Sequence, residues 1–511
     1  MRIARGFISP VLVLLFWTGA CPAEDTPRLA FAQVQVNDRS ASLLFSTSLE
    51  FTCLLNTGAS RLGLKNHEPW VAISQLSIST SDLTPVSHAG QTFSAPMIIA
   101  YVPLWARPIL HLLPFRLDGV IGWPEVRHNI LVFDDDQQII SRVDQLPPAT
   151  AGWLKLKVVP ADSLLLEVPL ADGSKGVISL NIGLETGRTD LRMSAGPWRE
   201  WQSAHGHGAG TNDAQIGPLA LTGVTVKELP SREAADLFEA NPGARAVWQL
   251  GTPALAHLDL VVDGINGWAY LHPKPAAQTS DQSAGGGNWQ LADNVRLSAD
   301  NLFVYAGWYQ RCKPDVASAW ADYNQALRLN PNNAAALSGC GLIHEIQGDF
   351  SNAVSCYDQV IHLRPDNSEW ERLYRQTLLW RANGPPGTAA PIVPATSGPV
   401  IAAVKLDPVV VTVAQTAGNL PWPKTLQLFL DGSVDEKALL AAAKQRHGEH
   451  PVTAQKAQAE YFIGEAHLRQ GDLPGAREWF KKCQSAGVKA DSEYALAVAE
   501  LGRLKAVAHD N

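Results

Sequence analysis

A change in hydrophobic period divides this chain of 511 residues into two parts. Before residue 276, apolar residues alternate with polar ones in short runs, as in Phe31–Val36 (Phe-Ala-Gln-Val-Gln-Val), and a period of two predicts β-strands. Residues 276–287 are small and polar, a composition typical of a flexible linker. From residue 294 onward the spacing of apolar residues is helical. The pattern therefore predicts a multidomain protein, with an all-β half joined by a linker at 276–293 to an all-α half.

Two short motifs stand in the first part of the β half. One is Leu54–Ser60 (Leu-Leu-Asn-Thr-Gly-Ala-Ser), which follows a strand-like run and is expected to form a turn unfavourable to helix; the other is Leu117–Trp123 (Leu-Asp-Gly-Val-Ile-Gly-Trp). In this order and spacing they resemble the two signatures of aspartic proteases of the retropepsin and pepsin type. The resemblance implies a β lobe at 28–155, in which the second motif packs under the loop of the first.

The same pattern recurs at 156–275. A strand-like run at Val177–Leu184 leads into Glu185-Thr186-Gly187, and Leu250–Leu255 repeats the closing motif. A repeat of roughly 120–130 residues indicates two copies of one structural unit. The resemblance therefore implies a bilobal, aspartic-protease-like half with a second lobe at 156–275, in which Glu185 has the position that Asn56 has in the first lobe.

Asn56 and Glu185 thus correspond to the catalytic pair of the family. Family enzymes use two Asp carboxylates that share one proton; one activates water and the other protonates the scissile carbonyl. An Asn amide donates a hydrogen bond but transfers no proton, and loss of general acid–base help costs about 10²- to 10⁴-fold in rate. The longer Glu side chain moves its carboxylate by roughly 1 Å. We therefore expect a degenerate lobe pair that does not cleave peptides.

Other parts of the two loops are retained. By the resemblance, the threonines tie the loops together, the glycines give backbone freedom, and the Ser adds a donor; the matching positions are Thr57, Gly58, Ser60, Thr186 and Gly187. Because such a cleft can bind an extended peptide through strand-like hydrogen bonds, these are candidate ligand-binding positions. Two alternatives stay open: an active aspartic-type endopeptidase that uses Glu185 with another carboxylate, and lobes with a purely structural role.

The helical half carries small and aromatic residues at the spacing of tetratricopeptide (TPR) repeats. Residues 334–367 have Gly341 and Tyr357 at the expected places, residues 457–490 have Gly464 and Phe480, and residues 300–333 fit the same pattern. The resemblance implies superhelical TPR arrays at 294–382 and 418–511, separated by a Pro- and Gly-rich linker at 383–417. It also implies a concave surface that binds proteins or peptides.

Residues 1–23 resemble an export signal. Arg2 and Arg5 precede a short apolar core at Phe7–Trp17, which is too short for a membrane span. Thr18–Cys21 resembles the lipobox of bacterial lipoproteins, and lipidation of Cys21 and simple cleavage nearby both stay open. In either case we expect the mature chain in the periplasm or cell envelope, with membrane contact only through a lipid anchor at Cys21.

The remaining features indicate no cofactor, metal or nucleic acid. A formal net charge of −8 argues against a nucleic-acid partner. His205 and His207 lack a third ligand, and Asp134–Asp136 lacks the spacing of a calcium loop. The cysteines after the signal show no CxxC spacing, so three of them are either buried thiols or include one disulfide pair: Cys312, Cys340 and Cys356. The predicted function is protein or peptide binding.

Overall fold

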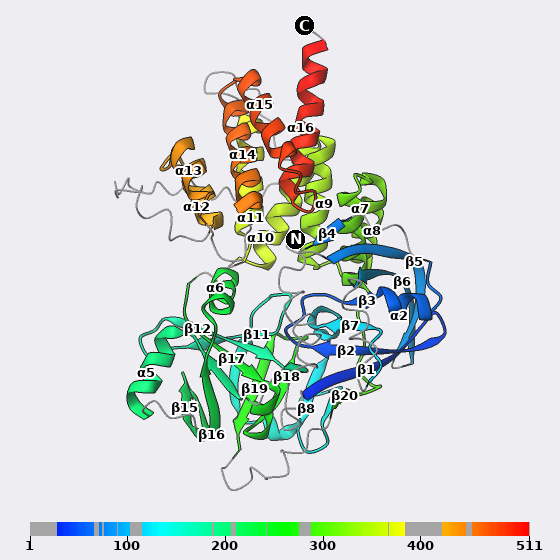
Figure 1. Cartoon of the computed structure of the whole chain (residues 1–511), viewed down its shortest axis with the longest axis vertical. Helices are drawn as coiled ribbons and strands as arrows, with labels where there is room; N and C mark the ends of the chain where they lie inside the picture. Colours follow the sequence, from blue (N-terminus) through cyan, green and yellow to red (C-terminus); the bar gives the residue numbers. More distant parts are fainter. Residues whose placement is uncertain are drawn as a thin grey trace. The chain divides into compact units, whose positions relative to one another are not determined.

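The computed structural model describes residues 28–65, 71–73, 76–88, 90–102, 115–185, 189–205, 211–241, 243–274, 288–365, 367–383, 422–445 and 452–509. The chain forms two compact units, one ending at Tyr309 and the other beginning at Gln310. Strands make up most of the first, here called the β unit, and helices make up the second, the helical unit (Figure 1). The predicted order of a β half followed by a helical half is therefore confirmed.

Several predicted segments lie outside the described residues. They are the signal segment with Cys21, the first part of the linker at 276–293, and nearly all of the linker at 383–417. No described helix has both the length and the apolar composition needed to cross a membrane.

The first half of the β unit is built around a short strand, β3 (Cys53–Leu55). β6 (Gln91–Tyr101) runs parallel to it on one side, and β7 (Gly119–Gly122) runs antiparallel on the other. β7 also pairs in parallel with β2 (Arg39–Ser46), which forms a hairpin with β1 (Arg28–Val36). Because β3 is held on both sides, the residues that follow it are fixed in position.

The second half repeats this arrangement strand for strand. β14 (Leu191–Met193) lies between β16 (Leu219–Glu228), which is parallel to it, and β17 (Ala244–Gly251), which is antiparallel. β17 pairs in parallel with β12 (Lys175–Asn181). The counterparts of β2, β3, β6 and β7 are therefore β12, β14, β16 and β17, and the predicted internal repeat is confirmed.

The two halves of the β unit share one sheet. β8 (Ile130–Asp134) pairs antiparallel with β18 (Leu258–Asp263), and Val132 lies opposite Val261. Further strands extend this arrangement: β4 (Val71–Ile73), β5 (Leu76–His88), β9 (Ile139–Val143), β10 (Leu154–Val158), β11 (Leu165–Pro169), β13 (Leu184–Glu185), β15 (Thr211–Ile216) and β19 (Trp268–Pro273). Short helices connect them: α2 (Asn56–Arg61), α4 (Trp123–Val126), η1 (Pro148–Thr150), α5 (Ala195–His205), α6 (Ser231–Ala240) and η2 (Thr252–Ala256).

The predicted linker at 276–293 contains a strand that sequence reasoning missed. Trp289–Leu291 forms β20, which pairs in parallel with β1 and with β9, and Trp289 is fully buried. Three residues are too few to show an alternating pattern, so the period gave no signal here. The chain then enters α7 (Asp300–Cys312), and the division between the two units falls within this helix.

Beyond α7 the helical unit is built from paired helices (Figure 1). They are α8 (Val316–Leu329), α9 (Ala334–Gln347), α10 (Phe350–Leu363), α11 (Glu369–Asn383), α12 (Trp422–Leu430), α13 (Glu436–Ala442), α14 (Val452–Arg469), α15 (Leu473–Ser485) and α16 (Ser492–His509). Several begin with an Asp or Asn side chain that accepts a main-chain amide of the first turn, a favourable N-cap: Asp315, Asn333, Asp349, Asp435 and Asp472.

Paired helices approach closely where a glycine faces an aromatic ring, as the repeat pattern predicted. A Cβ on Gly341 of α9 would lie 2.7 Å from the Tyr357 ring of α10, and one on Gly464 of α14 would lie 2.6 Å from the Phe480 ring of α15. Both rings are fully buried. The small residue and the ring therefore act together to set the distance between the two helices of each pair.

Candidate functional site

Asn56 begins α2, a short helix directly after β3. The predicted non-helical turn is therefore wrong. Gly58 accepts the Leu62 amide at 2.9 Å, as in an α-helix, and a Cβ on Gly58 would stand 2.2 Å from the carbonyl oxygen of Asp118. Glycine is required here because the Asp118 backbone approaches closely, and not because the turn needs a left-handed residue.

The Asn56 side chain is engaged within the β unit. It is 9% exposed, and its Oδ1 accepts the amide of Val102 at 3.1 Å. The Ser60 hydroxyl donates to the Asn56 carbonyl at 2.8 Å, and Thr57 between them is half-buried. Asn56 and Ser60 thus both hold the first turn of α2 in place.

Asp118 is the buried charge beside this loop. Its carboxylate accepts the Ser42 amide at 2.8 Å and forms a two-point ion pair with Arg61, with Nε–Oδ1 at 2.9 Å and Nη2–Oδ2 at 2.7 Å. Arg116 adds a second cation at 3.0 Å, and the Asp118 carbonyl accepts the Leu55 amide at 2.8 Å. The second motif therefore packs under the loop of the first, as predicted. Sequence reasoning missed the clamp that Asp118 forms, and the signal for it was the Arg61 that directly follows the first motif.

The structure describes Glu185 only through its backbone. Glu185 lies in β13 and pairs with Arg28 at the start of β1. Thr186 and Gly187 lie outside the described residues. Among the described residues, one side-chain tie between the two halves comes from Thr47, whose buried hydroxyl donates to the Leu180 carbonyl at 2.6 Å.

Two equivalent hydrogen bonds fix which residues of the two halves correspond. In the first half, the amide of Leu55 donates to the carbonyl of Asp118 at 2.8 Å, across the β3–β7 pair. In the second half, the amide of Ser194 donates to the carbonyl of Val247 at 2.9 Å, across the β14–β17 pair. Ser194 is therefore the counterpart of Leu55.

The counterpart of Asn56 is then Ala195, and not Glu185. Asn56 begins α2 after β3, and Ala195 begins α5 after β14. The sequence Glu185-Thr186-Gly187 resembles the family motif, but it precedes β14. The counterpart of the Asn56 loop follows β14 and begins at Ala195. Neither the methyl group of Ala195 nor the amide of Asn56 gives up or takes up a proton in the pH range of peptide hydrolysis, so the two residues together offer no general acid or base.

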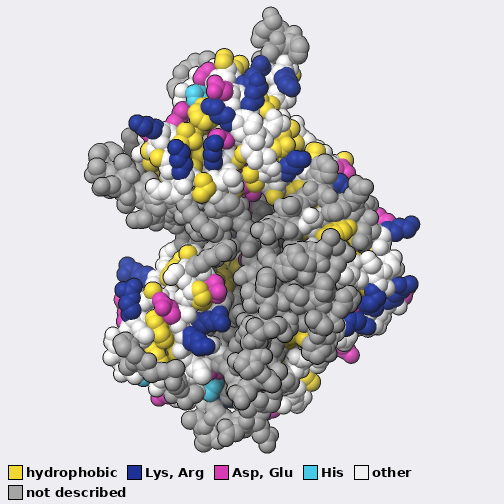
Figure 2. All heavy atoms as spheres, in the orientation of Figure 1, with side chains coloured by type: hydrophobic (Ala, Val, Ile, Leu, Met, Phe, Trp, Pro, Cys, Tyr) yellow, Lys and Arg dark blue, Asp and Glu magenta, His cyan; other side chains and the backbone are white. Residues whose placement is uncertain are grey.

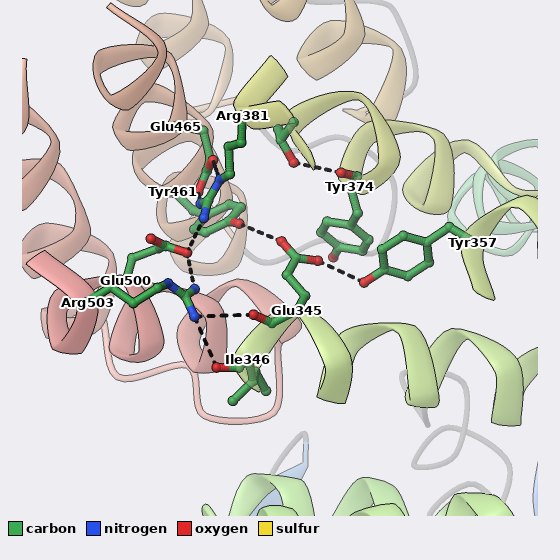
Figure 3. A network of polar contacts seen from close by, with 10 residues as sticks. Glu345, Ile346, Tyr357, Tyr374, Arg381, Tyr461, Glu465, Glu500 and Arg503 are labelled. Atoms are coloured by element: carbon green, nitrogen blue, oxygen red, sulfur yellow. Dashed lines mark hydrogen bonds and ion pairs between the residues drawn. The ribbon is translucent and has the colours of Figure 1, made fainter. Parts of the chain in front are cut away.

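A second candidate site lies in the helical unit, where polar side chains from separate helices meet (Figure 3). The carboxyl group of Glu345 on α9 is fully buried and accepts hydrogen bonds from the hydroxyls of Tyr357, at 2.9 Å, and Tyr461, at 3.3 Å. Burial raises the pKa of this carboxyl to about 8. A buried acid with two hydroxyl donors therefore joins α9, α10 and α14.

Arg381 of α11 and Arg503 of α16 are cations of this group (Figure 3). The Nε of Arg381 donates to Glu465 of α14 at 3.0 Å, and its Nη1 donates to Glu500 of α16 at 2.6 Å. Arg503 of α16 donates to the carbonyls of Glu345, at 3.3 Å, and Ile346, at 3.1 Å, which lie at the end of α9. Helices on either side of the segment 384–421 are therefore joined by charged groups.

α9 and α14 are covered around their circumference. In α9 the buried residues include every position of 336–343, and in α14 they include every position of 457–465. A helix with one open face would instead show exposed residues at every third or fourth position. Both helices therefore lie inside the helical unit rather than along an open groove.

The other candidates from the sequence add no site. Asp134 accepts the amide of Gln137 at 2.9 Å, as in a turn after a strand, and His207 lies outside the described residues. Within the described ranges, no His, Cys, Asp or Glu cluster is arranged to hold a metal ion. Cys312, Cys340 and Cys356 are free thiols in this structure.

A family model described as Tetratricopeptide repeat matches residues 315–368 and 436–491. The predicted repeats at 334–367 and 457–490 lie wholly within these matches, and the predicted repeat at 300–333 is matched from residue 315 onward. The helical unit therefore contains tetratricopeptide repeats.

Parts of the chain are similar to solved structures. The retroviral protease-like domain of Ddi1 from Leishmania major is 14% identical, over 24% of this chain and 95% of that one, with a TM-score of 0.18. MamA from Desulfovibrio magneticus RS-1, from residue 41 to its end, is 15% identical over 42% of this chain and 96% of that one, with a TM-score of 0.18. No curated protein matches the sequence.

Proposed function

We propose that this chain is a protein-binding scaffold: its TPR repeats hold a protein partner, and its aspartic-protease-like β unit does not hydrolyse peptides. The observation that carries the proposal is the pair of TPR matches in the helical unit, because stacked helical repeats present extended surfaces to other proteins. The absence of proteolysis is supported by Asn56 and Ala195, since two side chains without a carboxyl group cannot share a proton.

Partner binding is tested by photo-crosslinking from single positions. On the face in view in Figure 2, the described surface of the helical unit mixes basic, acidic and hydrophobic side chains, and large apolar residues are exposed singly. Leu329 is 50% exposed and Leu473 is 41% exposed in the helical unit, while Leu83 is 65% exposed in the β unit. A photoreactive residue at Leu329 or Leu473 should give a discrete adduct in the source cells. Adducts from Leu83 alone would overturn the scaffold proposal.

Peptide hydrolysis is tested with the full chain, casein and a peptide library between pH 3 and pH 8. We expect no cleavage above a heat-treated sample. Cleavage that a transition-state peptide analogue inhibits, and that Glu185→Ala abolishes, would instead establish the active endopeptidase that the sequence left open.

We also propose that the chain is exported to the periplasm or cell envelope. The positive end and apolar core of residues 1–23 support this, and Cys21 is the residue that a lipid anchor would use. Mass spectrometry of the mature N-terminus in a bacterial host tests both points. A chain that still begins at Met1 would contradict export, and an N-terminus other than Cys21 would contradict the anchor.

A further inference from the structure

The last helix that the structure describes, α16, packs on its sequence neighbour α15 and also contacts α9 and α11. Stacked repeats contact mainly their sequence neighbours, and α9 is flanked in sequence by α8 and α10. α16 comes from the far end of the chain, yet it donates from Arg503 to the carbonyl of Ile346, at the end of α9, at 3.1 Å. We call the covered surface the α9/α11 face.

Besides the Arg503 contact with α9, polar contacts with α11 hold α16 on the α9/α11 face at two places. Near the start of α16, the Tyr374 hydroxyl of α11 donates to Glu493 at 2.7 Å. Two turns later, Arg381 donates to Glu500 at 2.6 Å (Figure 3). Both glutamates are nearly fully buried, with exposures of 2% and 3%. The face therefore recognises two acidic residues seven positions apart on a helix.

Apolar residues of α16 lie between and beside the two glutamates. Leu496, Ala497, Leu501 and Leu504 are all less than 10% exposed. Together with Glu493 and Glu500 they form one stripe with the i, i+3, i+4, i+7 spacing by which an amphipathic helix docks in a groove. α16 thus has the chemistry of a bound ligand helix.

We propose that the α9/α11 face is the partner-binding surface of this chain, that its partner is an amphipathic helix of the α16 type with two glutamates seven positions apart, and that α16 occupies the face until such a helix displaces it. This rests on the proposed scaffold function and names the partner class. The face that α16 would uncover carries the guanidinium of Arg381 and the hydroxyl of Tyr374, both of which water can solvate.

The test uses a fluorescent peptide of residues 492–509 and the full chain. In the wild-type chain α16 competes with the peptide, so the apparent affinity falls with the fraction of open face. Glu500→Lys in the chain places a cation beside Arg381 and weakens the internal helix while leaving the face intact. We expect the peptide to bind this variant at least about 10-fold more tightly than the wild-type chain, by fluorescence anisotropy. Glu478→Lys, at a glutamate of α15 that is 71% exposed, is the matched control and should leave the affinity unchanged.

Equal affinity for the wild-type chain and a folded Glu500→Lys variant would overturn the proposal. Dimerisation of the variant through exchanged α16 helices, seen by concentration-dependent light scattering, would overturn it in favour of a second copy as occupant. Hydrogen exchange on the wild-type chain gives an answer even if the variant does not fold: α16 amides should exchange while those of α14 stay protected, and exchange of both helices together would show that α16 is a permanent part of the core. If the peptide test fails but a photoreactive residue at Leu329 or Leu473 still gives a discrete adduct, the proposal for the α9/α11 face is overturned while the proposed scaffold function is retained.

Discussion

Asp118 and Arg61 form a two-point ion pair, with Nε–Oδ1 at 2.9 Å and Nη2–Oδ2 at 2.7 Å. The Asp118 side chain is 3% exposed and that of Arg61 is 37% exposed. Because the carboxylate also accepts the Ser42 amide, one buried charge fixes both α2 and β2. Asp118, an acidic group beside the Asn56 loop, therefore has a structural task.

Asp118→Asn should destabilise the β unit by about 2 kcal/mol. The amide carries no charge for Arg61 to pair with, and its NH2 group would face a hydrogen-bond donor, either Arg61 or the Ser42 N–H. The measurement is the urea midpoint of the β unit, followed by tryptophan fluorescence. Asp172→Asn is the matched control, since this carboxylate is 57% exposed beside Arg245, and it should shift the midpoint little. Equal shifts for the two variants would contradict the clamp.

Gly58→Ala should destabilise the β unit by about 3 kcal/mol, because the added methyl group would stand 2.2 Å from the Asp118 carbonyl and overpacking against backbone is not relieved by a rotamer change. Gly196→Ala in α5 is the control: nothing lies within 4 Å of its Cβ position, and because the helix propensity gained is opposed by the proline that follows at 197, the replacement should change the stability little. Thermal unfolding of both variants measures the difference. A neutral Gly58→Ala would show that α2 can move away from β7.

Asn56→Asp alone should not produce proteolysis, because the corresponding position of the second half is Ala195 and a single carboxyl group cannot share a proton with a methyl group. Peptide-library assays between pH 3 and pH 8 check this, with circular dichroism to confirm folding. Activity in Asn56→Asp that Glu185→Ala removes would mean that Glu185 acts at the second position after all.

The helical unit should lose stability as pH rises. Burial raises the pKa of Glu345 from 4.5 to about 8 and that of Glu493 to about 7. At a pH between 4.5, the ordinary pKa of Glu, and these raised values, the folded state keeps protons that the unfolded state has released. The stabilisation from these bound protons is therefore fully present below about pH 4.5 and is lost as pH rises through 7 to 8. The slope is about 1.4 kcal/mol per pH unit for each retained proton.

Glu345→Gln should remove the Glu345 part of this pH dependence, because an amide does not ionise. Urea midpoints at pH 5, 6.5 and 8 measure the effect, and Glu478→Gln at the exposed site on α15 should keep the wild-type profile. If Glu345→Gln and the wild-type chain lose the same stability between pH 5 and pH 8, the buried carboxyl is not the source.

The architecture was largely predictable, because it depends on local patterns. The spacing of Gly341 to Tyr357 and of Gly464 to Phe480 identified the helix pairs, since one glycine and one ring set each helix contact. The two motifs at Leu54–Ser60 and Leu117–Trp123 predicted that β7 packs under the loop after β3. Each of these signals lies within one or two neighbouring elements.

The sites could not be predicted to the same extent, because they depend on strand register and on long-range contacts. Glu185 was placed by the strand-like run at 177–184 and the Glu-Thr-Gly sequence that follows it, whereas the pairing of β14 with β17 shows that Ala195 follows the equivalent strand. The contacts of Arg381 with Glu465 and Glu500 join residues 84 and 119 positions apart, and no periodicity in a sequence reports on such a distance.

The antiparallel pair in which Val132 faces Val261 has a practical consequence for dividing this chain. A cut between residues 155 and 156 would split β10, which begins at Leu154. It would also remove β18 from β8, and the amide and carbonyl groups along this Val- and Leu-rich edge of β8 would then have no strand to pair with. An unpaired edge strand of this kind tends to form hydrogen bonds with strands of other chains. Either half of the β unit expressed by itself should therefore precipitate or assemble with copies of itself, and mixing the two freshly refolded fragments should restore solubility.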